Sequence, residues 1–188
     1  MKTKTRCPWC EKNEVMMKYH DKEWGVPLFD DRRLFEFIVL DTFQAGLSWN
    51  AVLQKRENFR KAFAGFDPEK ISKFNEEKIS ALLLDPGIIR NKLKVRATVT
   101  NAVAYLSVQK EYGSFEKYIW TFSDRKVIKN KWKDQSQIPA KNELSDAMSA
   151  DLYSRGFKFV GSTICYAFMQ AAGIVNDHIT SCFRHKEV

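Results

Sequence analysis

Apolar side chains recur every three or four residues along most of this chain of 188 residues. In one such pattern the apolar positions are Leu34, Phe35, Ile38 and Val39. Side chains with this spacing lie on one face of an α-helix, whereas a half-buried strand alternates apolar and polar residues. No segment shows a convincing alternation, and there is no internal repeat. The sequence therefore predicts an all-α fold in which helices are joined by short turns.

Capping residues and turn signals separate the predicted helices. The stretch 123–142 is polar, rich in lysine and contains Pro139, so it is predicted to be a long irregular loop. Helices are expected from Asp30 or Asp31 onward, from Ser48 to Phe63, briefly after Asp67, from Asn75 to Leu84, from Arg90 to Glu111, from Ser114 to Phe122, from Asn142 or Ser145 to Gly156, and from Gly161 to Ala172. The length predicts a single compact domain, 1–188, or two small lobes that share a core.

The chain contains 31 Lys and Arg residues against 23 Asp and Glu residues, a formal net charge of +8. Such an excess favours polyanionic partners, either nucleic acid or an anionic membrane surface. No apolar run approaches the roughly 18–20 residues that a membrane span needs. The basic start of the chain is not followed by the apolar segment of a signal peptide. We therefore expect a cytoplasmic protein with no membrane-spanning segment. A monomer is a separate expectation, because nothing in the sequence shows the oligomeric state.

Aromatic residues are numerous, with 14 Phe, 5 Trp and 6 Tyr. Most such residues fill a hydrophobic core. Flat rings beside positive charge also stack on nucleic-acid bases. Composition alone does not distinguish the two roles.

The cysteines and histidines lie mostly near the two ends of the chain. Cys7 and Cys10 form a Cys-x2-Cys pair, His20 follows, and His178 and Cys182 are four residues apart. On a helical turn the last two would share one face, and zinc prefers four nitrogen and sulfur ligands. We favour a zinc ion that joins the chain ends, with N-terminal ligands from among Cys7, His20 and Cys10. A redox-active Cys-x2-Cys pair and free buried cysteines are the alternatives.

A basic segment follows the turn at Asp85-Pro86-Gly87. Residues 87–96 contain four basic residues, and no Asp or Glu occurs from 86 to 110. A helix that begins after a glycine turn presents backbone N–H groups to a phosphate, and Arg90 and Lys92 would add Coulombic attraction. The alternative is a solvated helix face without a special role.

Five motifs, in order from Arg6 to Cys182, resemble those of one enzyme family. They are Arg6-Cys7-Pro8-Trp9, Tyr19-His20-Asp21-Lys22-Glu23-Trp24-Gly25-Val26-Pro27, Gln44-Ala45-Gly46-Leu47-Ser48-Trp49, Gly87-Ile88-Ile89-Arg90, and Arg155-Gly156-Phe157-Lys158-Phe159-Val160-Gly161 continuing to Asn176-Asp177-His178. With these motifs the chain resembles the DNA-3-methyladenine glycosylase I family, in the helix-hairpin-helix superfamily of DNA repair enzymes. The resemblance covers nearly the whole chain.

The resemblance implies a two-lobe helical fold, with a zinc lobe from about 1–35 and 143–188 and a hairpin lobe from about 36–142. The ligands of the implied structural zinc are Cys7, His20, His178 and Cys182. The implied walls of a pocket for an extruded base are Tyr19 and Trp49, with Trp9 and Trp24 nearby. The expected contacts to the DNA backbone are Gly87, Arg90 and Lys92.

Two departures from the family pattern stand out. Family members usually carry a glutamate that hydrogen-bonds the base three residues before the glutamine of the Gln-Ala-Gly-Leu-Ser-Trp motif, whereas this chain has Asp41 there. Aspartate keeps the charge, but its reach is shorter by about 1.5 Å, the length of one C–C bond. The hairpin also contains one glycine, Gly87, where most enzymes of the superfamily have two.

The activity implied by the resemblance is hydrolysis of the N-glycosidic bond of 3-methyladenine in alkylated double-stranded DNA, which leaves an abasic site. Asp41 is the expected catalytic carboxylate. We expect no strand cleavage, because a nucleophilic lysine should be partly desolvated, whereas Lys92 and Lys94 are predicted to lie in a cationic cluster. The alternative is a lesion-binding protein with weak activity or altered specificity, because Asp41 replaces the usual glutamate.

Overall fold

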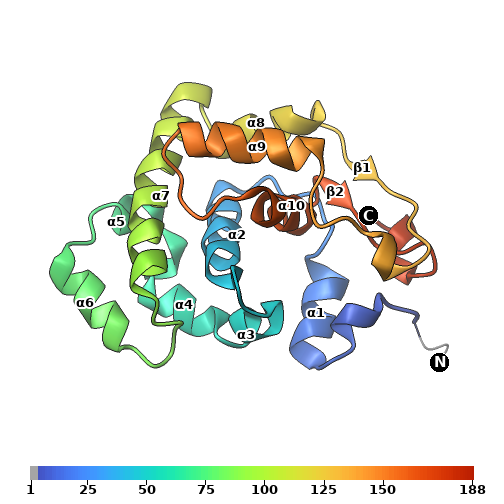
Figure 1. Cartoon of the computed structure of the whole chain (residues 1–188), viewed down its shortest axis with the longest axis horizontal. Helices are drawn as coiled ribbons and strands as arrows, with labels where there is room; N and C mark the ends of the chain where they lie inside the picture. Colours follow the sequence, from blue (N-terminus) through green and yellow to red (C-terminus); the bar gives the residue numbers. More distant parts are fainter. Residues whose placement is uncertain (1–3) are drawn as a thin grey trace.

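The computed structural model describes residues 4–188, which are largely helical (Figure 1). The helices are α1 (Glu14–Lys22), α2 (Asp31–Gln44), α3 (Trp49–Gln54), α4 (Arg56–Ala62), α5 (Pro68–Ile71), α6 (Glu76–Leu84), α7 (Lys92–Tyr112), α8 (Phe115–Ile119), α9 (Glu143–Ser154) and α10 (Ser162–Ala171). Among the described residues, no helix is long and apolar enough to cross a membrane. The predicted helical architecture is confirmed.

Helix α2 runs through the middle of the molecule, and α7 and α10 pack against it (Figure 1). All ten residues from Leu34 to Phe43 are buried, as expected of a helix surrounded by other elements. The Asp30 side chain caps its start by accepting a hydrogen bond from the Arg33 amide. At its other end, Lys94 Nζ from α7 donates to the carbonyl oxygens of Phe43 and Ala45. These bonds satisfy carbonyls that a helix end leaves unpaired, and so they hold the last turn of α2 in place.

Two local predictions are corrected by the structure. The helix expected from Ser48 to Phe63 is divided into α3 and α4 at Lys55, whose ammonium group donates to the carbonyl oxygens of Pro86 and Gly87. The stretch 123–142 is mostly irregular, but it contains a short strand, β1 (Ile128–Lys129), parallel to β2 (Val175–Asn176). Backbone hydrogen bonds therefore attach this stretch to the C-terminal segment.

Most aromatic rings fill the core, as predicted. Phe43, Phe59 and Phe63 contact one another, with ring centroids 4.6–6.0 Å apart, where the last turn of α2 meets α4. Tyr105 and Phe115 stack at 4.2 Å where α7 meets α8. The rings that do not follow this pattern surround the cavity described below.

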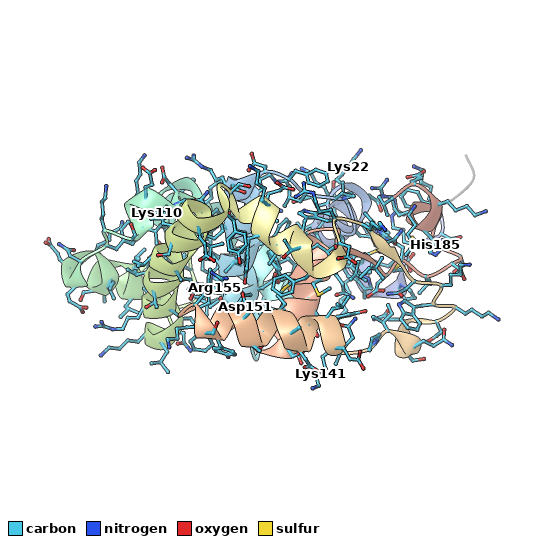
Figure 2. All side chains as sticks on the ribbon, turned by 90° about the horizontal axis from the view of Figure 1, so that it is seen from above. Lys22, Lys110, Lys141, Asp151, Arg155 and His185 are labelled. Carbon is cyan, nitrogen blue, oxygen red and sulfur yellow. The ribbon has the colours of Figure 1, made fainter. Side chains whose placement is uncertain are left out.

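Charged side chains cover the outside, and Lys22, Lys110 and Lys141 point away from the ribbon (Figure 2). Asp151 and Arg155 of the α9 region belong instead to a contact between helices. Asp151 accepts hydrogen bonds from the Tyr118 hydroxyl at 2.6 Å and from Arg155 Nε at 2.7 Å. Asp151 therefore attaches α9 to α8 and does not face the cavity.

Candidate active site and metal centre

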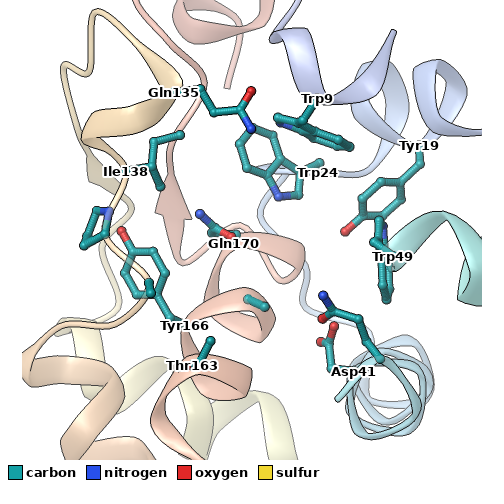
Figure 3. A pocket seen from close by; sticks show the side chains of 14 residues that line it. Trp9, Tyr19, Trp24, Asp41, Trp49, Gln135, Ile138, Thr163, Tyr166 and Gln170 are labelled. Carbon is teal, nitrogen blue, oxygen red and sulfur yellow. The ribbon is translucent and has the colours of Figure 1, made fainter. Parts of the chain in front are cut away.

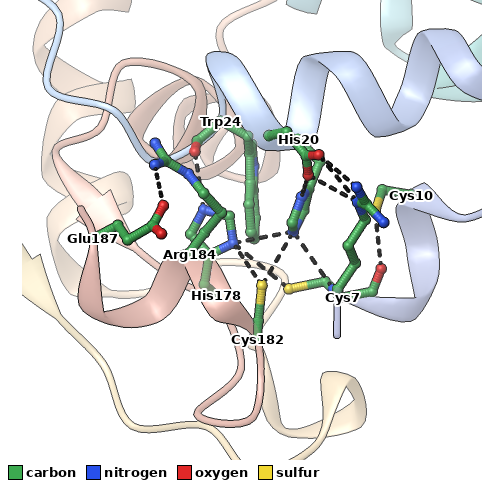
Figure 4. Close-up of polar contacts among 10 residues, drawn as sticks. Cys7, Cys10, His20, Trp24, His178, Cys182, Arg184 and Glu187 are labelled. Carbon is green, nitrogen blue, oxygen red and sulfur yellow. Dashed lines mark hydrogen bonds and ion pairs between the residues drawn. The ribbon is translucent and has the colours of Figure 1, made fainter. Parts of the chain in front are cut away.

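Four buried side chains from the two ends of the chain converge beside α1 (Figure 4). The ligand atoms of Cys7, His20, His178 and Cys182 all lie within 4.8 Å of one another. His178 Nδ1 is 3.5 Å from Cys182 Sγ and 3.7 Å from Cys7 Sγ. His20 Nε2 is 3.1 Å from His178 Nδ1 and 3.5 Å from Cys182 Sγ.

These separations fit a tetrahedral metal ion. Zn–N bonds of about 2.0–2.1 Å and Zn–S bonds of about 2.3 Å give tetrahedron edges of about 3.3–3.8 Å. The hydrogen bond between the two thiols lowers the pKa of Cys182 and raises that of Cys7. Cys10 stands outside the cluster, since its thiol donates to the Cys7 carbonyl oxygen. The group could therefore hold a metal through two sulfur and two nitrogen atoms.

The second nitrogen of each histidine ring has its own partner. His20 Nδ1 lies 2.8 Å from the carboxylate of Asp21, which Arg6 also binds. Burial opposes ionisation of Asp21, but hydrogen bonds from Arg6 and His20 lower its pKa on balance. His178 Nε2 donates to the Trp24 carbonyl oxygen at 3.0 Å. Such outer contacts orient histidine ligands in metal sites.

The expectation of a helical turn at His178 and Cys182 is wrong. Both residues lie in an irregular segment after β2. A turn from Ile179 to Cys182 returns the chain, because the Cys182 amide donates to the Ile179 carbonyl oxygen at 2.8 Å. The Asn176 side chain accepts from the His178 amide and holds the other end of the turn.

A cavity of about 330 Å³ opens beside this cluster (Figure 3). Its volume is at the lower end of the range for small-molecule sites, about 300–1,000 Å³. The residues around it come from the N-terminal segment with α1, from α2, α3, the stretch before α9, and α10: Trp9, Tyr19, Trp24, Asp41, Gln44, Trp49, Gln135, Ile138, Pro139, Ala140, Thr163, Tyr166, Ala167 and Gln170. All five residues predicted to bind or act on a base are thus brought together here.

Four of the five aromatic rings at the cavity lie against one another. Tyr19 and Trp49 have centroids 5.3 Å apart and are inclined by 58°, so they do not stack face to face. Trp9 and Trp24 meet edge to face at 5.0 Å. Figure 3 shows Tyr19 and Trp49 on the side of the cavity opposite Tyr166. This arrangement leaves flat aromatic surface available to a planar ligand.

Two polar atoms at the cavity are buried and have no hydrogen-bond partner among residues 4–188. They are Asp41 Oδ2 and Trp49 Nε1. Burial raises the pKa of Asp41 well above its ordinary value. Burial, followed by the field of Asp41, also raises the pKa of Tyr19. A buried polar atom without a partner costs free energy, so these atoms indicate a site that a ligand completes.

Sequence reasoning missed the wall made by α10. Thr163, Tyr166, Ala167 and Gln170 have the spacing of a single helix face. Two polar residues at this spacing in an otherwise apolar helix were the available signal. The contribution of residues 135–140 had no comparable signal, because an irregular segment has no periodicity.

The predicted DNA-binding hairpin lies between α6 and α7. Arg90 and Lys92 are exposed and form no ion pair within the described part of the chain. A Cβ added to Gly87 would lie 2.9 Å from Asp85 Oδ1 and 3.3 Å from Asn58, so a larger residue there would require these two side chains to shift. The Asn91 side chain already accepts from the amides of Leu93 and Lys94, which reduces the free N–H groups at the start of α7.

The predicted cationic cluster is smaller than the sequence suggests. Lys94 is buried against the end of α2, and burial lowers its pKa. Arg96 forms an ion pair with Glu76. The sequence places four basic side chains together, whereas the fold leaves Arg90 and Lys92 to face solvent.

Residues 9–185 match the model of the methyladenine glycosylase family. The chain belongs to this family. A DNA-3-methyladenine glycosylase from Haemophilus influenzae is 48% identical over 178 residues, covering 95% of this chain and 96% of that protein. The family match, 9–185, includes all the residues around the cavity.

Solved structures agree with this assignment. A crystal structure of 3-methyladenine DNA glycosylase I has a TM-score of 0.93 and 47% identity, and the match covers 95% of this chain and 98% of the other. A second structure, solved to explain 3-methyladenine recognition by the Staphylococcus aureus enzyme, has a TM-score of 0.92 and 34% identity, covering 95% of each chain. The chain therefore has the family fold over nearly its whole length.

Proposed function

We propose that this protein is a DNA repair glycosylase that hydrolyses the N-glycosidic bond of 3-methyladenine in alkylated double-stranded DNA and leaves an abasic site. The observation that carries the proposal is the unpaired carboxyl group of Asp41, buried in an aromatic cavity of a methyladenine glycosylase family member. Relatives over nearly the full length bear the name DNA-3-methyladenine glycosylase.

The charge of the substrate explains why one carboxylate suffices. Methylation at N3 makes the base cationic while it is attached to deoxyribose, and the base becomes neutral as the bond breaks. The leaving group therefore needs little help from a general acid. The remaining task is to extrude and hold the base, which Tyr19 and Trp49 do by stacking and cation–π contact. Asp41 accepts a hydrogen bond from the exocyclic amino group and favours the cationic form over neutral adenine.

Asp41 is the only acidic residue among the described residues around the cavity. Its side chain is shorter than the glutamate usual in the family, by about 1.5 Å. It comes from the last turn of α2, which Lys94 holds through two backbone carbonyls. We propose that a shift of the backbone, or a water molecule, closes this gap.

Zinc is the metal that best fits Cys7, His20, His178 and Cys182, because their donor set and separations match its tetrahedral preference. When bound, zinc supplies structural cross-linking of the chain ends. The four residues would form the centre of a zinc lobe, and 36–142 would form most of a hairpin lobe. The segment 128–132 is better grouped with the zinc lobe, because it pairs with β2 and bonds Asp177.

The hairpin is the proposed contact to the DNA backbone, through Gly87, Arg90 and Lys92. Their exposure and charge suit phosphate, whose contacts dominate DNA affinity. Strand cleavage is not expected. Lys94 is desolvated, but its ammonium group is bonded to two carbonyls, and it does not line the cavity. We further propose that the protein acts as a cytoplasmic monomer.

A base-release assay on N-methylated DNA, read by chromatography, tests the function. We expect free 3-methyladenine from the purified protein and markedly less from the Asp41→Asn variant. Borohydride should trap no covalent adduct with DNA. Binding to alkylated DNA without release of a base would instead identify a lesion-binding protein. A trapped adduct would identify a lyase.

A further inference from the structure

A second buried carboxylate, Asp177, lies between the metal cluster and the cavity. Asp177 has no exposed surface and directly precedes His178. Its Oδ1 accepts hydrogen bonds from Asn130 Nδ2 and Trp132 Nε1, each at 2.7 Å. Its Oδ2 accepts from the Tyr166 hydroxyl at 2.8 Å and from Gln170 Nε2 at 2.7 Å. The carboxylate therefore receives four hydrogen bonds.

These bonds determine which way the Gln170 amide faces. A glutamine amide has a donor end and an acceptor end, and a carboxylate only accepts. The nitrogen of Gln170 must therefore face Asp177, which turns Oε1 to the other side of the amide. Gln170 points into the cavity (Figure 3), and no group within residues 4–188 donates to its Oε1. The cavity wall on α10 thus presents a hydrogen-bond acceptor.

We propose that Asp177 is a positioning residue that fixes the Gln170 amide with its carbonyl oxygen toward the base. The pocket then favours purines with an amino group at ring position 6 over purines with a carbonyl group there. This proposal rests on the proposed function and adds a source of selectivity to it. It places part of the base recognition in α10, outside the aromatic walls and Asp41.

The chemistry of the two bases explains the expected selectivity. The N–H hydrogens of 3-methyladenine are those of its exocyclic amino group, and Gln170 Oε1 can accept one of them. In 3-methylhypoxanthine a carbonyl oxygen replaces that amino group, so two acceptors would face each other. A site built to accept a hydrogen bond strongly rejects an analogue that leaves its buried groups unpaired.

The Asp177→Asn variant should reverse the orientation of the Gln170 side-chain amide. The new side chain has one donor end, which must face either Trp132 or the pair formed by Tyr166 and Gln170. The Trp132 indole cannot accept a hydrogen bond, whereas the hydroxyl of Tyr166 and the amide of Gln170 can both turn to accept one. The asparagine nitrogen therefore faces Gln170, whose own nitrogen then turns toward the base.

The test compares the Kd values of free 3-methyladenine and 3-methylhypoxanthine, measured by quenching of tryptophan fluorescence. We expect the wild-type protein to prefer 3-methyladenine by about tenfold or more, and Asp177→Asn to lower that preference by about tenfold. Asn130→Ala is the matched control, because it removes one hydrogen bond to Asp177 Oδ1 and leaves the Gln170 contact intact. Its preference should stay within about twofold of wild type.

Gln170→Met keeps the length of the side chain but removes the hydrogen-bond acceptor. This variant is used for the test if the Asp177→Asn protein does not fold. We expect it to lose most of the preference. The proposal is overturned if a folded Asp177→Asn or Gln170→Met protein keeps the wild-type preference, or if Asn130→Ala changes it equally. Release of 3-methyladenine from DNA by the wild-type protein is measured in parallel. If the proposed function fails, the wild-type protein releases no base. If only this inference fails, the wild-type protein still releases it.

Discussion

The four-residue Cys and His cluster and the cavity are neighbours that both use the N-terminal segment and α1, but their polar atoms differ in hydrogen bonding. Around Cys7, His20, His178 and Cys182, each ring nitrogen has a partner or faces the other ligand atoms. At the cavity, Asp41 Oδ2 and Trp49 Nε1 are buried and have no partner among residues 4–188. The histidine rings of the first region are thus satisfied, whereas the second region has two buried polar atoms without a partner among the described residues.

This difference teaches which region stabilises the fold and which one gives up stability for function. A satisfied polar cluster that binds a metal adds to the free energy of unfolding. Buried unpaired atoms subtract from it, and such strain is typical of functional sites. The two regions are linked through Trp24, whose carbonyl oxygen holds His178 while its ring faces the cavity.

Loss of the metal should produce the largest effect. We expect Cys182→Ala to lower the metal content and to reduce the free energy of unfolding by several kcal/mol, because binding of a structural zinc contributes directly to folding. Metal analysis and thermal unfolding measure both quantities. Cys10→Ala is the matched control, since Cys10 is buried nearby but lies outside the cluster. Full metal stoichiometry in Cys182→Ala would contradict the assignment.

Substitution of Asp41 should affect activity and stability in opposite directions. We expect Asp41→Asn to reduce release of 3-methyladenine about 100-fold, because the cationic base loses its charged partner. At a pH above the raised pKa of Asp41, the same variant should unfold at a higher temperature than wild type, since asparagine carries no charge to bury unpaired. Base release and melting temperature measure the two effects. If Asp41→Asn is fully active and less stable than wild type, the cavity does not give up stability for function, and the contrast with the Cys and His cluster is lost.

The pH dependence sharpens the same contrast. Burial raises the pKa of Asp41, and Tyr19 and Cys165 are the titratable groups that sense its field. Binding of the cationic base needs the ionised form, so base release should fall as pH drops through this raised pKa.

Stability should change in the opposite sense. The folded state binds the Asp41 proton more tightly than the unfolded chain, so stability decreases as pH rises from the ordinary value of 3.8 through the raised pKa. In the Asp41→Asn variant, neither base release nor stability should change over this pH range. Identical profiles for wild type and variant would assign the pH dependence to another group.

Contacts of the hairpin with DNA should have the smallest effect per residue. We expect Arg90→Ala and Lys92→Ala each to weaken DNA binding several-fold and to reduce the slope of log Kd against log salt by about one. Arg96→Ala is the control, because Arg96 is already paired with Glu76. Affinity measured at several salt concentrations tests this. An equal effect of Arg96→Ala would show that net charge matters more than position.

Much of the fold was accessible from local patterns. The three- and four-residue spacing of apolar side chains predicted α2, α7, α9 and α10, and Asp30, Ser48, Asn75 and Ser114 act as helix caps in the structure. The Cys and His positions identified the four ligands as candidates. Helical propensity and capping depend on neighbours in sequence, so they can be recognised without a tertiary structure.

Tertiary contacts decided the rest. The basic character of residues 90–96 is a sequence property, but burial of Lys94 and pairing of Arg96 with Glu76 depend on how α7 packs against α2 and α6. The turn that brings Cys182 to His178 is not helical, although the spacing suggested a helix.

The sequence by itself determined the helices, the candidate ligands and the acidic residue of the pocket motif. The orientation of Gln170 and the missing partner of Asp41 arise only when segments far apart in the chain meet. Hydrogen bonds and burial depend on distances in space, and spacing along the chain does not specify those distances.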